Sequence, residues 1–502
     1  MVPRRTGRLL VGLDAGTSAT KACAFTVDGR LVAEASVPVA LEHPAPGWAE
    51  QPAEALEASA VEALRSLAGL VDSRAVEAIG ITGQMGGLVL VGEDGRAVSP
   101  HLSWLDGRAA GEIGAAMARD GPRLLALGGL APYLAPKAAW WRREHPESYA
   151  RATRMVEPAG YVALRLGGDG AEAAWVDRSS SGFVGVYDVR SGEVVPELCE
   201  LWGVEPGLAP RVVPAGEVVG RLAAETGLPA GVPIIAAPGD GPCGWLGAGA
   251  VDPGVTVDTA GTSDHIGICG TRFAPDTEGQ VLISLASGVE GLWHVQGYTS
   301  GTGLAYRWLV ETLGGEPAEL ERLAAELPPG SEELVTIPHF GGRVCPYEPA
   351  VSGAWVGLTW RHRPEHLYRA HLEAIAYEFA LYVEAARRLD PSFEPTEVRV
   401  IGGGGSSRLW AQIKADVLGV PYVILEESNY TCWGAALCAG AGVGLQPDMA
   451  GAARAAARAR EVVSPNPDAV ESYRGLVDLY ESLYPALAPA YRTLWDRRRA
   501  GV

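Results

Sequence analysis

The tetrapeptide Ala-Gly-Thr-Ser occurs twice in this chain, at Ala15–Ser18 and again at Ala260–Ser263. Each copy follows an apolar run typical of a β-strand, Leu-Leu-Val-Gly-Leu-Asp before the first and Val-Thr-Val-Asp-Thr before the second. A strand that turns sharply through Gly-Thr-Ser presents backbone N–H groups and hydroxyls that can hold an anion. Two such turns predict two related lobes that close on one phosphate chain. Two ordinary hairpins in a chain rich in Gly and Ala are the alternative.

Strand and helix signals recur in a similar order in both halves of the chain. The first half predicts strands at 8–13, 21–27, 31–39, 78–82, 87–91 and 232–237, and a helix at 51–67. The second predicts strands at 254–258, 265–269, 280–286, 291–296 and 397–401, and helices at 304–313, 366–389, 407–418 and 471–499. Residues 110–165 read as mainly helical and 167–215 as irregular. Because 502 residues exceed what one core usually holds, we expect two α/β lobes, 1–247 and 248–502.

Charge and cysteine content restrict the partners and the compartment. The formal net charge is −19, from 41 basic and 60 acidic side chains, which argues against nucleic acid or an anionic membrane as partner. No apolar run approaches the roughly 20 residues of a membrane-spanning helix. The seven cysteines include no Cys-x-x-Cys pair, which favours buried free thiols in a reducing compartment. We therefore expect a cytoplasmic protein.

The first turn carries the strongest local motif, which runs from Asp14 through Thr17 and Ser18 to Lys21. A carboxylate at a strand end can hold Mg²⁺ through water, Thr17 and Ser18 offer donors, and Lys21 adds a point charge. Lys21 is one of only three lysines, with Lys137 and Lys414. A hairpin with a capping aspartate is the structural alternative, but it does not explain why these polar residues cluster.

A second carboxylate, Asp240, follows the apolar strand at 232–237 and lies between Gly239 and Gly241. The flanking glycines exclude bulk, so a ligand can come close. A carboxylate there could accept the proton of a hydroxyl that attacks a γ-phosphate. It could also cap the segment 243–250, and the sequence leaves both roles open.

The run Gly402–Gly405, followed by Ser406 and Ser407, lies between a predicted strand and a predicted helix. With Glu426 and Glu427 about 20 residues on, it resembles a dinucleotide-binding fingerprint. An NAD-dependent oxidoreductase is therefore an alternative of a different class. Against it, the third glycine of the fingerprint falls at Ser407, and no complete run of βαβ units follows. The chain has no Gly-x-x-x-x-Gly-Lys-Ser/Thr loop and no Gly-x-Ser-x-Gly elbow, which excludes those two motif classes.

Taken together, these positions resemble the FGGY family of carbohydrate kinases, and its xylulokinase-like branch in particular. Eight ordered segments carry the resemblance: Asp14–Ser18, Gly47–Gln51, Thr82–Gly87, Trp104–Arg108, Pro238–Asp240, Ala260–Ser263, Gly353–Thr359 and Gly402–Trp410. The resemblance implies a duplicated actin-like (ribonuclease H-like) ATPase fold, with two lobes and a cleft between them. It implies that sugar binds mainly to the first lobe and ATP mainly to the second.

The resemblance also implies a reaction and a role for each matched residue. The γ-phosphoryl group of MgATP would pass to a sugar hydroxyl, with Asp240 as general base and Asp14 organising Mg²⁺. The implied sugar contacts are Gln84, Met85, Gly86, Asp106, Arg108 and Asp240. The implied ATP contacts are Thr17, Ser18, Lys21, Gly261, Thr262, Gly303, Arg307, Gly403, Gly404 and Ser407. Family members are often dimers, so a homodimer is also implied.

The sequence departs from the family pattern at the sugar. Gly86 replaces a histidine that xylulokinases usually carry, and the missing side chain is expected to enlarge the sugar pocket or to admit water. Asp264-His265 and Pro242 also replace the usual residues. A ketopentose such as xylulose is the expected substrate, and other pentuloses, hexuloses, sugar acids and polyols remain open. A catalytically silent nucleotide-binding regulator is a third class, which the presence of Asp14, Asp240 and Thr262 disfavours.

Overall fold

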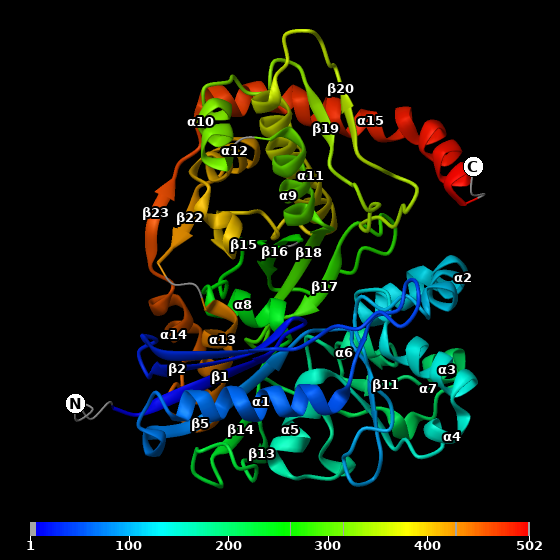
Figure 1. Cartoon of the computed structure of the whole chain (residues 1–502), viewed down its shortest axis with the longest axis vertical. Coiled ribbons are helices and arrows are strands. Elements are labelled where there is room, and N and C mark those ends of the chain that lie inside the picture. The colour runs from blue at the N-terminus through cyan, green and yellow to red at the C-terminus, as the bar shows by residue number, and fades with distance from the viewer. Residues whose placement is uncertain (1–6, 262, 315, 427–428, 500–502) are drawn as a thin grey trace.

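The computed structural model describes residues 7–261, 263–314, 316–426 and 429–499. It contains two large β-sheets, one in each half of the chain, and helices pack against both (Figure 1). In the view of Figure 1 the first half of the chain forms the lower lobe and most of the second half forms the upper lobe. Within the described ranges, no helix combines the length and apolar character that crossing a membrane requires.

The first sheet has six strands in the order β13-β14-β5-β1-β2-β3. Their bounds are β1 (Leu9–Ala15), β2 (Ala19–Thr26), β3 (Leu31–Pro38), β5 (Val76–Gly83), β13 (Val218–Arg221) and β14 (Pro233–Ala236). β1 pairs antiparallel with β2 and parallel with β5, and β5 pairs parallel with β14. The strand meander expected over 8–39 is confirmed, and Gly29 turns the second hairpin with φ 90°.

The second sheet has seven strands in the order β17-β18-β16-β15-β21-β22-β23. They are β15 (Val255–Ala260), β16 (Asp264–Gly270), β17 (Ile283–Ala286), β18 (Trp293–Thr299), β21 (Glu397–Ile401), β22 (Tyr422–Leu425) and β23 (Ala459–Val463). β15 pairs antiparallel with β16 and parallel with β21, and β21 pairs parallel with β22. Six neighbouring strands of this sheet repeat the order and pairing directions of the first sheet: β18-β16-β15-β21-β22-β23 corresponds to β3-β2-β1-β5-β14-β13. The duplication expected from the two Ala-Gly-Thr-Ser turns is therefore present in the topology.

Helices α1 (Ala53–Ala68) and α5 (Pro158–Gly167) pack on the first sheet and bury its apolar face. Beyond them lies a layer of short elements with a hydrophobic cluster of its own. Its helices are α2 (Ala110–Gly128), α3 (Leu134–Glu144), α4 (Pro146–Tyr149), α6 (Ser181–Val184) and α7 (Pro196–Trp202). Its strands are β4 (Glu50–Gln51), β6 (Val89–Val91), β7 (His101–Leu102), β8 (Arg154–Val156), β9 (Trp175–Asp177), β10 (Tyr187–Asp188), β11 (Glu193–Val194) and β12 (Arg211–Val213).

The expectation that 167–215 is irregular is wrong in part. This range contains the helices α6 and α7 and the strands β9 to β12. These strands are two or three residues long and the helices four and seven. Elements this short are shorter than the segments over which hydrophobic periodicity can be recognised, so the sequence pattern cannot reveal them.

The second lobe is built around the long helix α11 (Pro364–Leu389), which is buried along most of its length. The helices α9 (Thr302–Leu313), α10 (Pro317–Ala325), α12 (Arg408–Leu418) and α15 (Pro467–Arg499) and the strands β19 (Val335–Ile337) and β20 (Ala354–Val356) complete it. All seven cysteines of the chain are buried and free, as the sequence predicted.

Three helices lie where the two lobes meet: α8 (Asp240–Gly247), α13 (Tyr430–Gly442) and α14 (Met449–Ala456). Although α13 lies in sequence between β22 and β23 of the second sheet, it packs on β1 and β5 of the first sheet (Figure 1). The approach is backbone to backbone, because a Cβ at Gly12 or Gly80 would overlap the carbonyl groups of Cys432 or Ala435.

Candidate active site between the two lobes

Two carboxylates lie at the ends of strands in the first sheet. Asp14 is the penultimate residue of β1, and Asp240 opens α8 directly after β14. The strand between them, β5, carries Thr82 opposite Asp14, and the Thr82 hydroxyl donates to the carbonyl oxygen of Pro238 at 2.6 Å. The sheet order therefore brings both carboxylates to one edge of the sheet, and this is the edge that faces the second lobe (Figure 1).

Asp240 is the first residue of α8, one position beyond the N-cap Gly239. Its Oδ1 accepts a hydrogen bond from the N–H of Gly241 at 2.8 Å. The pKa of Asp240 is raised to about 7. Burial is the main cause, and the negative charges of Asp14 and Asp177 add to it. A carboxyl group with such a pKa can exchange a proton near neutral pH.

The turn that presents Asp240 is held from two sides. The N–H of Gly239 donates to Ser179 Oγ at 3.0 Å, and Ser179 in turn donates to the buried carboxylate of Asp177 at the end of β9. On the other side, a Cβ at Gly239 would overlap the side chain of Met85. A side chain at position 239 would therefore force the Met85 side chain to move. Met85 thus packs against the turn that carries Asp240.

Asp14 faces Lys21 across the β1–β2 pair. Burial raises the pKa of Asp14 to about 6, and the charge of Lys21 opposes the rise. Lys21 Nζ donates to Asn429 Oδ1 at 3.2 Å, so it links the first turn to the residue before α13. Asp14 Oδ1 is buried and has no hydrogen-bond partner in the described part of the chain. An unpartnered carboxylate oxygen beside a strand end is a fitting ligand for Mg²⁺ or for water bound to it.

The first Gly-Thr-Ser turn is tied to the predicted sugar-site segment. The Thr17 hydroxyl donates to Gln84 Oε1 at 3.3 Å and accepts from Trp104 Nε1 at 3.1 Å. The amide nitrogen of Gln84, a buried residue, donates to Gln51 Oε1 at 3.1 Å. Ser18, at the tip of the turn, is exposed. Thr17 and Gln84, which the sequence assigned to ATP and to sugar, are therefore direct neighbours.

Gly86 lies in a clamped turn with φ 74°. Its N–H donates to Glu157 Oε1 at 2.7 Å, and its carbonyl oxygen accepts from Lys137 Nζ at 3.0 Å. A Cβ at Gly86 would lie 3.1 Å from the Phe183 ring and 3.4 Å from the Tyr133 ring. Two aromatic rings thus border the space that a side chain at this position would enter.

The buried charges that clamp Gly86 are both perturbed. Burial lowers the pKa of Lys137 to about 7 and raises the pKa of Glu157 to about 8. Asp177 and Asp240 also raise the pKa of Glu157. Lys137, Glu157, Asp177 and Ser179 were not predicted as site residues. Asp177 ends the short strand β9 and Glu157 follows the short strand β8, which was the signal available, but strands of three residues are too short to recognise.

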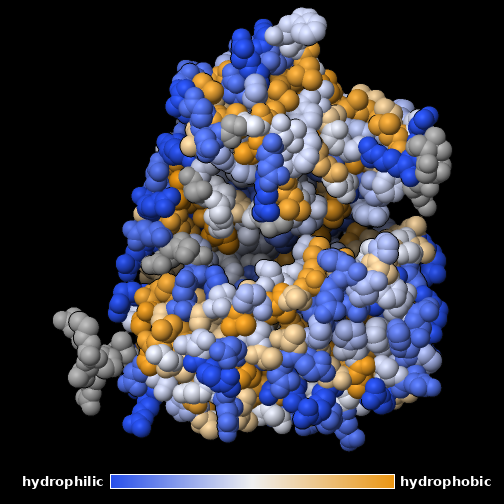
Figure 2. Space-filling view, viewed as in Figure 1, coloured by the Kyte–Doolittle hydropathy of each residue, from blue (hydrophilic) through white to orange (hydrophobic). Residues whose placement is uncertain are grey.

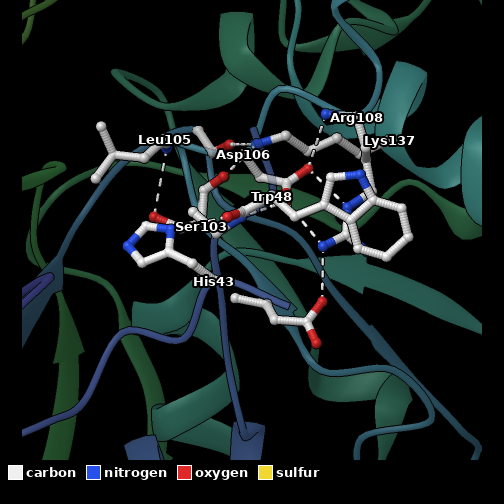
Figure 3. Close-up of polar contacts among 10 residues, drawn as sticks. His43, Trp48, Ser103, Leu105, Asp106, Arg108 and Lys137 are labelled. Carbon is white, nitrogen blue, oxygen red and sulfur yellow. Dashed lines mark hydrogen bonds and ion pairs between the residues drawn. The ribbon is translucent and has the colours of Figure 1, made fainter. Parts of the chain in front are cut away.

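Asp106 and Arg108 form a buried ion pair (Figure 3). Arg108 Nε lies 2.7 Å from Asp106 Oδ1, and its Nη2 lies 2.6 Å from Glu50 Oε2. The guanidinium carbon is 4.1 Å from the centroid of the Trp48 ring. The other carboxylate oxygen of Asp106 accepts from the N–H of Ala49 at 2.8 Å. This cluster joins the predicted segments Gly47–Gln51 and Trp104–Arg108.

The second Gly-Thr-Ser turn joins β15 to β16. Thr262 lies outside the described residues. Ser263 Oγ accepts from the Tyr298 hydroxyl and from the N–H of Gly301, each at 3.1 Å. Gly301 is the N-cap of α9, so the turn contacts the start of the helix that carries Gly303 and, one turn later, the exposed Arg307.

The glycine run at 402–405 packs against the end of β15. Gly402 has φ 88°, and a Cβ there would lie 2.5 Å from the carbonyl oxygen of Ala260. A Cβ at Gly404 would lie 2.5 Å from the Ala260 Cβ. Because Ala260 directly precedes Gly261, the glycine run and the second turn form one continuous surface. Gly403 and Gly404 belong to a short 3₁₀ helix, η4 (Gly403–Ser406).

Ser407 is the N-cap of α12. Its Oγ accepts from the N–H of Trp410 at 3.1 Å and donates to Glu321 Oε1 of α10 at 2.7 Å. The space-filling view has a groove between the upper and lower lobes (Figure 2). In Figure 1, α8, which begins at Asp240, lies between the two lobes. The first lobe supplies two half-buried carboxylates, Asp14 and Asp240, and the second lobe supplies a turn and a loop rich in glycine.

Comparison with known proteins identifies the relatives of this arrangement. The model of the N-terminal domain of the FGGY family of carbohydrate kinases matches residues 9–247, and the model of its C-terminal domain matches residues 257–443. A xylulose kinase of Bacillus subtilis (strain 168) is 26% identical over 489 residues, which cover 95% of this chain and 97% of the relative. A glycerol kinase of Aromatoleum aromaticum is 33% identical over 455 residues, covering 87% and 90%.

Solved structures agree with this relationship. A xylulose kinase from Rhodospirillum rubrum superposes with a TM-score of 0.86 at 30% identity, covering 97% of this chain and all of that one. The fold is the duplicated actin-like fold that the resemblance implied. None of these matches supports the NAD-dependent oxidoreductase interpretation of Gly402–Gly405. Two matched domain models, nearly full-length relatives and a shared fold lead to one conclusion: the chain belongs to the FGGY family of carbohydrate kinases.

Proposed function

We propose that this carbohydrate kinase transfers the γ-phosphoryl group of MgATP to a hydroxyl group of a ketopentose such as xylulose. The observation that carries the proposal is Asp240, a half-buried carboxylate at the start of α8 with its pKa raised to about 7. A general base works best when its pKa lies near the working pH. Relatives and solved structures named xylulose kinase support the choice of sugar.

In the proposed reaction, an ionised Asp240 oxygen accepts the proton of the sugar hydroxyl. The hydroxyl oxygen then bonds to the γ-phosphorus, the bond from that phosphorus to the β–γ bridging oxygen breaks, and ADP leaves with the electron pair. Gly239 and Met85 fix the position of Asp240, while Ser179 holds the Gly239 N–H. Such fixed placement removes much of the entropic barrier to a reaction between two bound molecules.

Asp14 is our candidate for holding Mg²⁺, directly or through water. Its Oδ1 has no hydrogen-bond partner among the described residues, and its neighbour Lys21 leaves the pair without excess negative charge. When bound, Mg²⁺ would neutralise charge on the phosphates. For ATP we propose phosphate contacts at Thr17, Ser18, Lys21, Gly261 and Thr262, and contacts with the rest of the nucleotide at Gly303, Arg307, Gly403, Gly404 and Ser407.

For the sugar we propose contacts at Gln84, Met85, Gly86 and Asp240, with Asp106 and Arg108 close by. The rings of Tyr133 and Phe183 next to Gly86 favour a substrate that needs no polar side-chain partner at that point. Glycerol or a sugar acid is the second candidate, because a glycerol kinase at 33% identity and gluconokinases at 24% are among the relatives.

The test is Asp240→Asn, assayed for ADP release with D-xylulose, D-ribulose, gluconate and glycerol. The wild type should turn over one of these, with D-xylulose the best. The variant should lose about 10²- to 10⁴-fold in kcat while its affinity for MgATP changes little, because the amide keeps the shape but accepts no proton. Asp72→Asn, at an exposed N-cap, is the matched control and should behave as wild type.

Near-wild-type turnover in Asp240→Asn would refute the general-base assignment. Activity confined to glycerol or gluconate would replace the ketopentose with the second candidate. ATP binding without turnover on any of the four would favour the catalytically silent regulator instead.

We also propose lobes at residues 1–247 and 248–502, a cytoplasmic location and a homodimer. The seven buried free thiols support the location, because such thiols persist in a reducing compartment. Analytical ultracentrifugation at micromolar concentration tests the dimer. A sedimentation coefficient that matches 52.5 kDa would reject it.

A further inference from the structure

A buried ionic cluster joins both arms of the β15–β16 hairpin to α12. Lys414 of α12 points its Nζ at Asp258 Oδ2, 2.6 Å away, and at Asp264 Oδ2, 3.4 Å away. All three side chains are almost fully buried, with exposed fractions of 2%, 0% and 1%. The proposed site uses none of them, and Lys414 is one of only three lysines in the chain.

The strand register explains why one lysine can reach both carboxylates. Asp264 pairs with Ala260 across the hairpin, and Asp258 lies two residues before Ala260 on β15. Alternate residues of a strand and directly paired residues share a face, so both carboxylates lie on the face that packs against α12. Lys414 therefore contacts both arms of the hairpin that ends in Gly261 and Ser263.

The same helix carries the glycine loop. α12 begins at its N-cap Ser407, and Lys414 lies seven residues on, about 10 Å along the helix axis. Gly404, before the helix, packs on Ala260 of the hairpin. The hairpin thus has two contacts with this segment of the chain. The glycine loop packs closely on Ala260, and Lys414 of α12 forms ion pairs with Asp258 and Asp264.

Lys414 supplies the positive charge that holds the two buried carboxylates of the hairpin against α12. Two carboxylates face one cation, and one oxygen of each, Asp258 Oδ1 and Asp264 Oδ1, has no hydrogen-bond partner in the described ranges. The Tyr422 hydroxyl donates to Asp258 Oδ2 at 3.2 Å, and Lys414 Nζ lies 3.9 Å from the Trp410 ring centroid. Burial raises the pKa of Asp264 to about 7, and Lys414 opposes the rise. Without the lysine, Asp264 would either take up a proton or repel Asp258 across the hairpin, and the charged link from α12 to the hairpin would be lost in both cases.

We propose that Lys414 is a positioning residue for nucleotide phosphates, because it locks the hairpin that presents Gly261 and Ser263 to the helix that presents the glycine loop. This inference rests on the proposed function, in which the turn contacts the phosphates and the loop contacts the adenosine. It predicts that losing Lys414 weakens ligands that need both elements and spares a ligand that needs only the loop.

The test compares Lys414→Met, which keeps most of the aliphatic stem, with Arg369→Met. Arg369 is the matched control, because it also forms a buried ion pair in this lobe, with Glu373 at 2.8 Å, but contacts α10 and α15 instead of the turn. Both changes should lower the melting temperature. Titration calorimetry should give a dissociation constant for MgADP raised about tenfold or more in Lys414→Met only, the size expected when one phosphate hydrogen bond is lost.

Three further readouts separate positioning from general damage. In Lys414→Met the dissociation constant for adenosine should stay within about twofold of the wild type, the KM for sugar should not change, and the KM for MgATP should rise. An unchanged MgADP affinity, an equal loss for adenosine, or an equal loss in Arg369→Met would overturn the inference. If the wild type itself does not bind MgADP, the proposed function fails as well.

A second variant keeps the test decisive if Lys414→Met does not fold. The triple change Asp258→Asn, Asp264→Asn and Lys414→Met removes both negative charges with the positive one, and neutral replacements of buried ion clusters are often tolerated. The triple variant should fold and still bind MgADP about tenfold more weakly, because the link from α12 to the hairpin is lost. Wild-type MgADP affinity in the triple variant would overturn the inference.

Discussion

The pH dependence of phosphoryl transfer follows from the environment of Asp240. The base must be ionised, and burial together with Asp14 and Asp177 holds its pKa at about 7. The profile of kcat/KM for the sugar should therefore fall as the pH drops below about 7. At pH 6 about a tenth of Asp240 is ionised and at pH 5 about a hundredth, so the rate should fall about tenfold per unit. Protonation of Asp14, whose pKa is about 6, steepens the fall at lower pH.

The assay is single-turnover phosphoryl transfer between pH 5 and 8.5, with saturating MgATP and subsaturating sugar. Asp177→Asn removes a negative charge that raises the pKa of Asp240, so it should move the acidic limb to lower pH. Ser179→Ala is the matched control, because it loosens the same turn without changing the charge. A rate that stays flat down to pH 5, or an acidic limb that Asp177→Asn moves upward, would refute the assignment.

Four further predictions concern stability and ligand binding. Arg108→Met should lower the free energy of unfolding by about 3–5 kcal/mol in a urea titration, because the buried Asp106 loses its counterion, whereas Arg322→Met at an exposed pair should cost far less. Gly86→Ala should cost more stability than Gly444→Ala and should raise the KM for sugar, since the two glycines have similar positive φ, 74° and 72°, but only Gly86 has rings within 4 Å; equal costs would dismiss the ring contact. Asp240→Asn should raise the free energy of unfolding at pH 8 by on the order of 1–3 kcal/mol, and the melting temperature with it. The gain should be smaller at pH 5, where the folded carboxyl is already protonated; no rise in melting temperature at pH 8 would contradict the raised pKa. MgATP should raise the melting temperature of the wild type and NAD should not; a shift with NAD alone would oppose the kinase assignment of the glycine loop.

The sequence was most informative where one pattern occurs twice. The strands at 8–13 and 254–258, each followed by Gly-Thr-Ser, predicted the paired hairpins β1–β2 and β15–β16, and both are present. Long amphipathic helices were also predictable: 366–389 became α11 (Pro364–Leu389), and 407–418 became α12 with Ser407 as its N-cap. Periodicity and capping are local properties, so one sequence is enough to reveal them.

What escaped prediction depends on contacts between distant segments. Nothing near Lys414 in the sequence points to Asp258 or Asp264, which lie about 150 residues away and meet it only through the β15–β16 register. Likewise Glu157 and Lys137 clamp Gly86 from two elements of the first lobe. These buried charges are recognisable only once the fold brings them together.

Helix α13 was not predicted from the sequence, and its packing explains both this failure and the way in which the lobes are joined. Its sequence, Tyr-Thr-Cys-Trp-Gly-Ala-Ala-Leu-Cys-Ala-Gly-Ala-Gly, has three glycines and no polar face, so propensity and periodicity both argue against a surface helix. The structure gives the physical reason, because α13 is buried between β1 and β5 on one side and α8 on the other. A Cβ at Gly434 would overlap the carbonyl of Cys243, and one at Gly247 would overlap that of Tyr430.

This glycine contact binds α8 and α13 to each other and to the first sheet as one unit. Asp240 is the first residue of α8, so the position of the base is fixed by the same packing that carries the second half of the chain back to the first sheet. Close backbone approach also leaves little freedom to slide, because each glycine meets a carbonyl group and not a flexible side chain. Asp240, the proposed base, is thus anchored to the first lobe, whereas the second turn and the glycine loop belong to the second sheet.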